Sequence, residues 1–279
     1  MVPDAENVLQ QWSNYAESGC GDEWLKIGGV YLEYGGDTCS AQLREDEFPY
    51  TGWAGFFLKA NTPEEYGQLA ELAVRHRMRI NTYVGGDIEG PLQALEGIAQ
   101  RLPLKDLRIV FFHLVYATDD QIRRMGKLNI HATCAPFNHL CKRAVYLLEG
   151  PGPVEKVLPL RSLDNSNIPA AFSTDNLPIN PMLTLWAAEA RRDETTGRVL
   201  GTGERLGRRE LLKGFTRHGA TLSFDEARRG SLEVGKLADL IVLSDDPMEV
   251  PTEALREVKV LMTMVGGKIV YRNPGAIDF

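Results

Sequence analysis

Two side chains that can do acid–base or metal chemistry directly follow apolar, strand-like segments. His113 closes the run Arg108–Phe112, and Asp175 comes just after the run Ile168–Ser173. A neutral imidazole is a common metal ligand, and a carboxylate can bind a metal or accept a proton from water. Each also has a structural alternative, His113 as a hydrogen-bonded core residue and Asp175 as a turn residue or the N-cap of the helix near Pro181. Both residues are therefore candidates for a catalytic or metal site.

A second group of metal-capable residues is close together in the sequence: His131, Cys134, His139 and Cys141. The first two fall in one strand-like segment, where a regular strand would point them to opposite faces of the sheet. We therefore do not expect a structural zinc site there. His139 lies in the loop after Pro136 and is considered again below.

The candidates must be positioned by strands that alternate with helices. The expected strands are 25–32, 79–84, 108–113, 129–134 and 168–173, and the expected helices are 62–76, 91–101, a helix beginning at Thr118, a short helix near Leu160, and 181–192. Alternating strands and helices predict a parallel sheet with covered faces. An eight-stranded barrel and an open doubly wound sheet both satisfy this pattern, and five units are too few to close a barrel.

The pattern changes after Gly207. Arg208–Arg217 is predicted to be a basic amphipathic helix, and three apolar runs follow it at 236–243, 258–265 and 268–271. Gly266-Gly267 separates the last two runs and predicts a hairpin turn. We expect two parts, a catalytic-type α/β part at 1–229 and a small β segment at 230–279.

Composition excludes several classes of protein. The chain has 279 residues, 43% of them hydrophobic and 25% charged, and a formal net charge of −7. An acidic chain is poorly suited to bind nucleic acid or anionic membranes, so a small-molecule substrate is expected. The polar N-terminal stretch is unlike a secretory signal, and four cysteines in a chain of this length do not suggest a disulfide framework. These features predict a cytoplasmic protein.

The tail has the most specific sequence motif. Gly230–Leu243 reads GSLEVGKLADLIVL, and Thr263–Tyr271 reads TMVGGKIVY. Both segments, together with the helix-like stretch Arg209–Ala220, resemble the amidohydrolase superfamily, in the branch that includes the N-substituted formamide deformylases. The resemblance extends over roughly Trp24–Tyr271. It implies an α/β barrel of which this chain supplies about strands four to eight, and a small β-sandwich that also takes strands from the N-terminus of the protein.

The resemblance also implies a metal site with His-x-His on strand one, a bridging Lys on strand four, His on strands five and six, and Asp on strand eight. His113 matches the strand-six ligand, unless a shifted alignment puts Phe111 there. Asp175 matches the strand-eight ligand, which also acts as the base. Tyr31 stands where the bridging Lys is expected. Asn81, or Tyr83 if the register slips by two residues, stands where the strand-five His is expected.

These departures predict at most one metal. Neither Tyr nor Asn is a usual zinc ligand, and no His-x-His is present in the chain. The resemblance places His139 where the family often has a substrate-contacting His. We expect His139, Asn81, Tyr83, Tyr31 and Asn176 to contact the substrate.

Two main hypotheses follow for function. In the first, the chain is a hydrolase of a non-peptide C–N bond, and a second polypeptide supplies the N-terminal half of the barrel and completes a mononuclear site with zinc, or with iron or manganese. In the second, it is a degenerate homologue without metal that acts as a ligand-binding or non-catalytic subunit. A third alternative is a truncated chain whose homo-oligomer covers the exposed sheet edge without activity.

Overall fold

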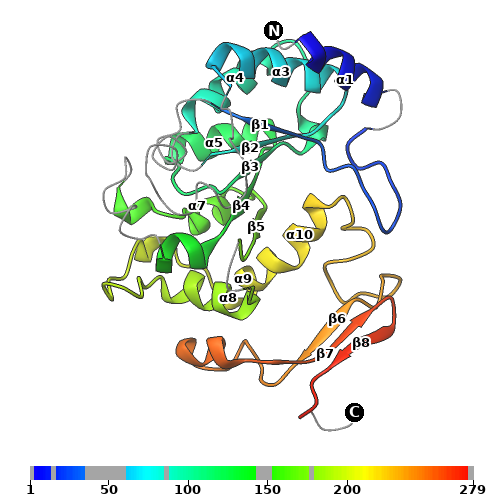
Figure 1. Cartoon of the computed structure of the whole chain (residues 1–279). Helices are drawn as coiled ribbons and strands as arrows, with labels where there is room; N and C mark the ends of the chain where they lie inside the picture. Colours follow the sequence, from blue (N-terminus) through cyan, green and yellow to red (C-terminus); the bar gives the residue numbers. More distant parts are fainter. Residues whose placement is uncertain are drawn as a thin grey trace.

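The computed structural model describes residues 3–13, 17–34, 61–84, 88–142, 153–175 and 179–275 (Figure 1). Its centre is a five-stranded parallel sheet with the order β1-β2-β3-β4-β5. The strands are β1 Val30–Glu33, β2 Ile80–Tyr83, β3 Val110–Phe112, β4 His131–Cys134 and β5 Ala170–Phe172. The spatial order follows the chain order without the reversal that a doubly wound sheet has. The sheet is therefore of the barrel type.

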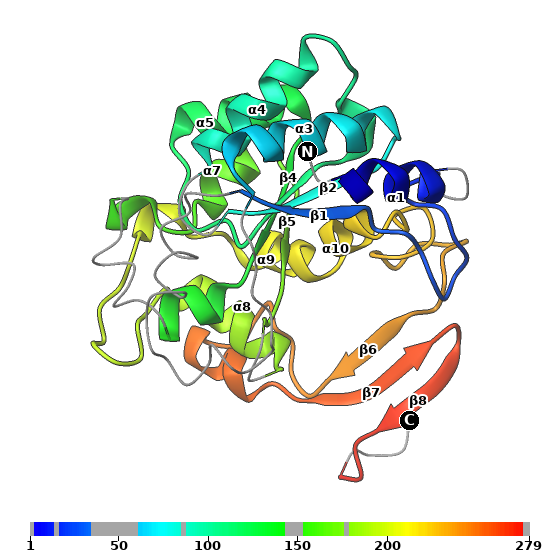
Figure 2. The ribbon, with the colours of Figure 1, turned by 45° about the horizontal axis from the view of Figure 1, so that its top comes forward.

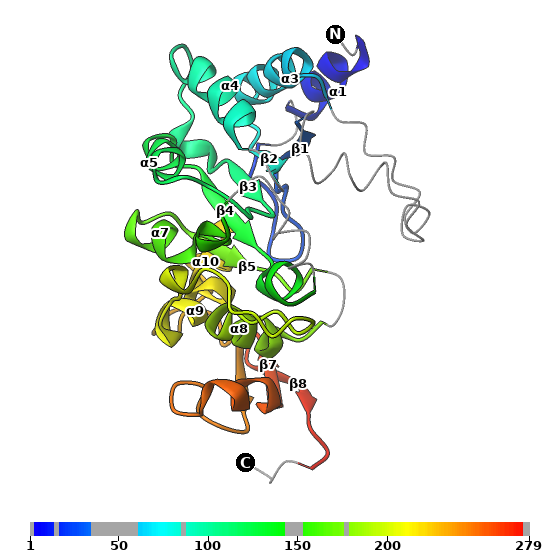
Figure 3. The same cartoon turned by 90° about the vertical axis from the view of Figure 1, so that its left-hand side faces the viewer.

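Helices cover one face of this sheet (Figure 3). They are α3 Pro63–Arg75, α4 Glu89–Ala99, α5 Asp119–Leu128 and α7 Leu160–Asn165. The beginnings of α3 and α5 are as predicted, because Thr62 and Thr118 each form a capping box with the residue three positions on. Beyond β5 follow α8 Pro181–Ala190, α9 Arg208–Phe215 and α10 Arg217–Leu222. A short helix, α1 Pro3–Ser13, precedes β1.

The core lies between the sheet and these helices. In β2, Ile80 and Thr82 are fully buried, and the Thr82 hydroxyl is 2.7 Å from the hydroxyl of buried Tyr66 in α3. The alternate residues Asn81 and Tyr83 are only half-buried, because they point to the opposite face, which the helices do not cover. This inner face is therefore partly exposed at Asn81 and Tyr83.

Two expected elements are different in the structure. The strand predicted at 25–32 begins only at Val30, because Gly29 has φ +110° and a side chain there would overlap the backbone of Arg79. The helix predicted at 208–217 is broken at Thr216 into α9 and α10. The break lets α10 pack along β5, where the His218 ring nitrogen Nδ1 lies 3.1 Å from the Ala170 carbonyl. Both predictions were wrong because contacts distant in sequence override the local pattern.

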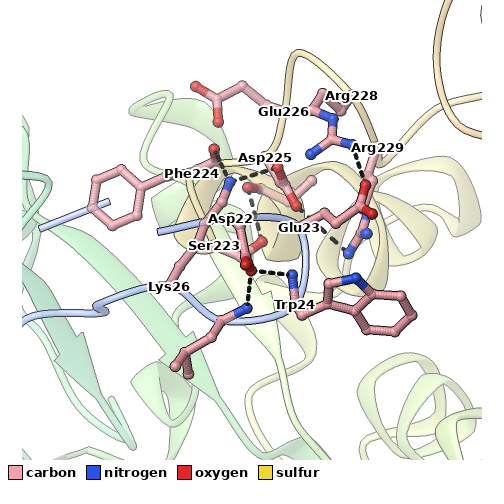
Figure 4. Close-up of polar contacts among 12 residues, drawn as sticks. Asp22, Glu23, Trp24, Lys26, Ser223, Phe224, Asp225, Glu226, Arg228 and Arg229 are labelled. Carbon is pink, nitrogen blue, oxygen red and sulfur yellow. Dashed lines mark hydrogen bonds and ion pairs between the residues drawn. The ribbon is translucent and has the colours of Figure 1, made fainter. Parts of the chain in front are cut away.

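Residues 17–29 are instead held as a loop against the turn that follows α10 (Figure 4). Lys26 donates from Nζ to the Asp225 carboxylate at 2.6 Å and to the Phe224 carbonyl at 3.0 Å. Arg228 pairs with Glu23 at 3.1 Å. The segment before the first strand is thus tied to the segment after the last helix. Two arginines that precede β2 and β3 add to these contacts: Arg79 donates to the Gly28 and Leu222 carbonyls, and Arg108 pairs with Glu226. We call the contacts of Lys26, Arg228, Arg79 and Arg108 the amino-edge clamp.

A second sheet, which is antiparallel, follows α10 in the chain. It consists of β6 Leu240–Leu243, β7 Val260–Val265 and β8 Lys268–Arg272. The predicted hairpin at Gly266-Gly267 is confirmed, since it joins β7 to β8. In Figures 1 and 2 this sheet lies beyond α8 and α10, at the opposite end of the molecule from α3 and α4. Among the residues described, no helix is long and apolar enough to cross a membrane.

Candidate active site at the carboxyl edge of the parallel sheet

Side chains capable of chemistry gather where the parallel strands end. Tyr83 is the last residue of β2, His113 directly follows β3, and Asp175 follows β5. His139 lies in the single π-helical turn Phe137–Lys142 after β4. Carboxyl ends of parallel strands share one edge, which is where barrel enzymes have their active sites. The sequence therefore predicted the correct edge for these residues.

Histidine and tyrosine rings are in contact at this edge. The ring centroids of His113 and His139 are 5.5 Å apart, with the two planes at 87°. The centroid of the Tyr83 ring is 5.3 Å from that of His113. His139 is buried and His113 is half-buried, so part of the His113 side chain is exposed to solvent. The structure thus brings together three of the residues predicted from sequence.

Asp175 is held by Asn138, a residue that the sequence analysis did not consider. The buried Asn138 amide donates from Nδ2 to Oδ2 of Asp175, across 37 positions in the chain. Asn138 directly precedes His139, so one turn after β4 contacts both the β3 and the β5 candidates. The only signal for Asn138 in the sequence was its place in the loop after Pro136. The amide donor therefore fixes the direction of the Asp175 carboxylate.

His113 and Asp175 share an uncommon backbone conformation. Their φ angles are +57° and +55°, in the left-handed region. Such conformations cost on the order of 1 kcal/mol and persist where surrounding contacts enforce them. At His113 the enforcing contacts come from β4, since Thr133 Oγ1 accepts from the His113 backbone N–H at 3.3 Å and the Thr133 carbonyl accepts from Leu114 at 3.0 Å. The turn after β3 therefore directs His113 to the carboxyl edge.

The two departures from the family pattern lie on the inner face near β1. Asn81 donates from Nδ2 to the carbonyls of Gly28 and Val30, at 3.3 and 3.1 Å. Tyr31 is opposite Asn81 in the register, and its hydroxyl is 3.4 Å from the Glu33 carboxylate. Asn81 thus holds the backbone of β1, which is a structural use of its amide. Asn176, the remaining predicted contact, lies outside the described residues.

The thiols and His131 belong to the interior rather than to this edge. Burial raises the pKa of Cys134 and of Cys141 to about 12, so both thiols are protonated near neutral pH. His131 is buried at the beginning of β4, and burial, followed by the charge of Arg108, lowers its pKa to about 4. Protonated thiols are poor metal ligands and poor nucleophiles.

The described residues do not by themselves fit a complete metal site. A catalytic zinc usually has three protein ligands. Within the described parts of the chain, no group of three or more His, Cys, Asp or Glu residues comes together closely enough to hold an ion. His113 and Asp175 supply at most two of the expected ligands, and Asn138 already uses one oxygen of Asp175. Any bound metal would need further ligands from outside the described residues.

A barrel-type parallel sheet with His and Asp at its carboxyl edge defines an α/β enzyme scaffold. Residues 2–271 match the model of the amidohydrolase family, and the chain belongs to that family.

Two curated relatives illustrate the similarity. The chain is 29% identical over 218 residues to an N-substituted formamide deformylase of Arthrobacter pascens, a match of 75% of this chain and 40% of that protein. It is 23% identical over 276 residues to the putative amidohydrolase YtcJ of Bacillus subtilis (strain 168), which covers 90% of this chain and 50% of that one. The chain therefore spans half or less of the length of these relatives.

A solved structure supports the fold. The chain superimposes on an uncharacterized metal-dependent hydrolase from Pyrococcus horikoshii OT3 with a TM-score of 0.67 and 23% sequence identity. The match covers 89% of this chain and 50% of that one. The five-stranded parallel sheet is thus part of an amidohydrolase-type fold.

Proposed function

We propose that this chain is the catalytic part of a hydrolase that cleaves a non-peptide, amide-type C–N bond. The observation that supports this most directly is the convergence of His113, His139 and the Asn138–Asp175 pair at the carboxyl edge. These residues come from the ends of three neighbouring strands, β3, β4 and β5. Membership of the amidohydrolase family supports the same class of reaction.

The residues of the chain suit proton transfer during hydrolysis. Asp175 has one carboxylate oxygen engaged by Asn138, which leaves the other to accept a proton from the attacking water. The same carboxyl group then returns the proton to the leaving nitrogen. The buried His139 ring packs against His113 and restricts its orientation. Tyr83, Tyr31, His139 and Asn176 are the proposed substrate contacts, whereas the Asn81 amide, also expected from the sequence to contact substrate, holds β1 instead.

One divalent metal is proposed, with zinc favoured and iron or manganese as alternatives. Such an ion would supply a water of lowered pKa. His113 and Asp175 would be its ligands from this chain. The remaining ligands would come from the N-terminal half of the barrel, proposed here as a second polypeptide. Tyr31 at the position of the bridging Lys supports one metal rather than two.

The exposed surfaces support a composite fold. In this proposal β1–β5 are barrel strands four to eight, and residues 230–279 are one part of a β-sandwich. Ile269, Val270 and Tyr271 on β8 are 43%, 61% and 46% exposed, as expected for a sheet that another layer covers. In the alternative, a second copy of this chain in a homo-oligomer covers these exposed residues. The buried free thiols of Cys134 and Cys141 favour a reducing, cytoplasmic setting.

The test is made on the purified protein with whatever chain copurifies. Intact mass identifies a second polypeptide, elemental analysis gives the metal content, and a panel of N-substituted amides tests hydrolysis. We expect about one metal per complex and a loss of hydrolysis of at least about a hundredfold in Asp175→Asn. Absence of metal, partner and hydrolysis together would refute the proposal.

A non-catalytic, ligand-binding subunit is the second candidate. Asn81 supports it, because its amide is engaged with the Gly28 and Val30 carbonyls rather than directed to the carboxyl edge. This candidate predicts ligand binding that Asp175→Asn leaves unchanged, without turnover of any amide in the panel.

A further inference from the structure

A row of aromatic rings crosses the inner face of the parallel sheet and ends at the candidate catalytic residues. The Tyr31 ring centroid is 5.4 Å from Phe112, and Phe112 is 5.6 Å from both Tyr83 and His113. The row contains Tyr31, Phe112, Tyr83 and His113, and each ring is within edge or tilted packing distance of the next. We call these four residues the aromatic row.

The register shows that the row belongs to one face. Tyr83 of β2 is directly opposite Phe112 of β3, and Tyr31 of β1 is opposite Asn81 of β2. The alternate residues, Thr82 and Phe111, are fully buried against the helices. The rings therefore project away from the helix layer, on the face that the described helices do not cover.

The four side chains of the aromatic row are all partly exposed to solvent. Tyr31 is 43% exposed, and Phe112, Tyr83 and His113 are half-buried. Fully buried aromatic residues of this sheet, such as Phe111, are on the other face. Tyr83 and Phe112 are the last residues of β2 and β3, so these partly exposed rings have the position of a substrate-binding wall beside the candidate catalytic residues.

The position of the row relative to the reacting group determines what it would bind. One end is His113, whose ring contacts His139, the residue after Asn138. A substrate whose scissile amide lies near His113 and Asp175 would extend its substituent along Phe112 toward Tyr31. The rings present aromatic faces and edges, which suit a flat aromatic ring better than a flexible aliphatic chain.

We infer that the aromatic row is the subsite for an aryl group, so that the preferred substrate is a neutral amide carrying an aryl substituent. This rests on the proposed function for the position of the scissile bond. The row itself is a binding feature and can be tested without turnover.

The test measures binding and hydrolysis separately on the full chain with any copurifying partner. Isothermal titration calorimetry compares phenylacetamide with cyclohexylacetamide, which has a ring of similar size without the aromatic faces, and hydrolysis assays use the same two amides. We expect phenylacetamide to bind about tenfold more tightly. Equal affinities would overturn the inference, whatever the hydrolysis assay shows.

Variants locate the effect. Tyr31→Leu and Phe112→Leu should each remove most of the aryl preference, while Tyr31→Phe, which keeps the ring, retains it. The matched control is Trp12→Leu, which removes an aromatic residue that is 54% exposed on α1, away from the row, and should leave the preference unchanged. Preference that persists in both row variants would contradict the assignment. If a variant fails to fold, the affinities of the two amides for the unaltered protein still decide whether an aryl group is preferred.

The two proposals fail in different ways. Aryl-selective binding without hydrolysis of either amide would refute the proposed reaction and leave the subsite standing. Hydrolysis of both amides together with equal affinities would refute the subsite and leave the reaction standing.

Discussion

The two edges of the parallel sheet are built in opposite ways. At the amino edge, Arg79 donates to the Gly28 and Leu222 carbonyls, and Arg108 pairs with Glu226 at 2.6 Å. Their guanidinium groups lie 4.8 and 5.0 Å from the centroid of the same Phe224 ring. At the carboxyl edge, by contrast, the half-buried His113 packs against the rings of His139 and Tyr83, and Asp175 accepts a hydrogen bond from the Asn138 amide.

This difference separates stability from function within one sheet. The amino-edge clamp joins the loop before β1 to the turn after α10, so it ties the first strand to the helix that packs on the last one (Figure 4). The amino edge is thus held by charged side chains that pair with carboxylates and backbone carbonyls, whereas the carboxyl edge presents the candidate catalytic side chains. Changes at the amino edge should therefore alter the free energy of unfolding, and changes at the carboxyl edge should alter activity.

The largest expected effect is at Arg79. Its side chain is 8% exposed, and Arg79→Leu would remove the donor to the Leu222 carbonyl and leave the Gly28 carbonyl with only the longer contact from Asn81. We expect the free energy of unfolding to fall by about 3 kcal/mol. Urea denaturation measures the change, with kcat of the folded fraction as the control. A large loss of kcat with unchanged stability would contradict the separation of the two edges.

Asn138 provides the converse test. Asn138→Leu removes the donor to Asp175, so its carboxylate would no longer be held in one direction. We expect kcat to fall roughly 10- to 100-fold, with a smaller change in KM. Asn138→Gln, which keeps an amide, should recover part of the rate. Rescue by Asn138→Gln distinguishes positioning of Asp175 from a general loss of folding, which circular dichroism would reveal. An equal loss of kcat in both variants would contradict the positioning role.

His131 makes the amino edge sensitive to acid. Burial lowers its pKa to about 4 in the folded protein, below the value near 6.5 expected in the unfolded chain. The unfolded state therefore binds more protons between these values, and this contribution to stability is present above about pH 6.5 and lost as the pH falls toward 4. His131→Gln should flatten the pH dependence of the free energy of unfolding in that window by about 2 kcal/mol. An unchanged slope in urea titrations at pH 4.5 to 7 would contradict this role.

The smallest expected effect is at Lys26. Its Nζ pairs with Asp225 at 2.6 Å, and the two side chains are 22% and 5% exposed. We expect Lys26→Met to lower the free energy of unfolding by no more than about 1 kcal/mol, because a partly exposed ion pair contributes little. Thermal melts at about 0.1 M and about 1 M salt would check this, because salt screens a partly exposed ion pair. A loss as large as that of Arg79→Leu would show that the loop, rather than the arginines, holds the edge.

Much of the site could be predicted from the sequence because strand ends are locally encoded. His113 and Asp175 each follow an apolar run, and a parallel arrangement brings the ends of such runs to one edge. Asn138 could not be predicted, since its partner Asp175 is 37 residues away and no local pattern requires the contact. The aromatic row depends in the same way on the register of three separate strands.

The sequence by itself determined the features that depend on near neighbours. These are the capped beginnings of α3 and α5, the hairpin at Gly266-Gly267, and the alternation of strands with helices. Only the tertiary structure decided where β1 begins, that the helix breaks at Thr216, and that Asn138 meets Asp175. The physical reason is the same in each case: a backbone approach or side-chain contact from a distant segment outweighs a local preference worth about 1 kcal/mol or less per residue.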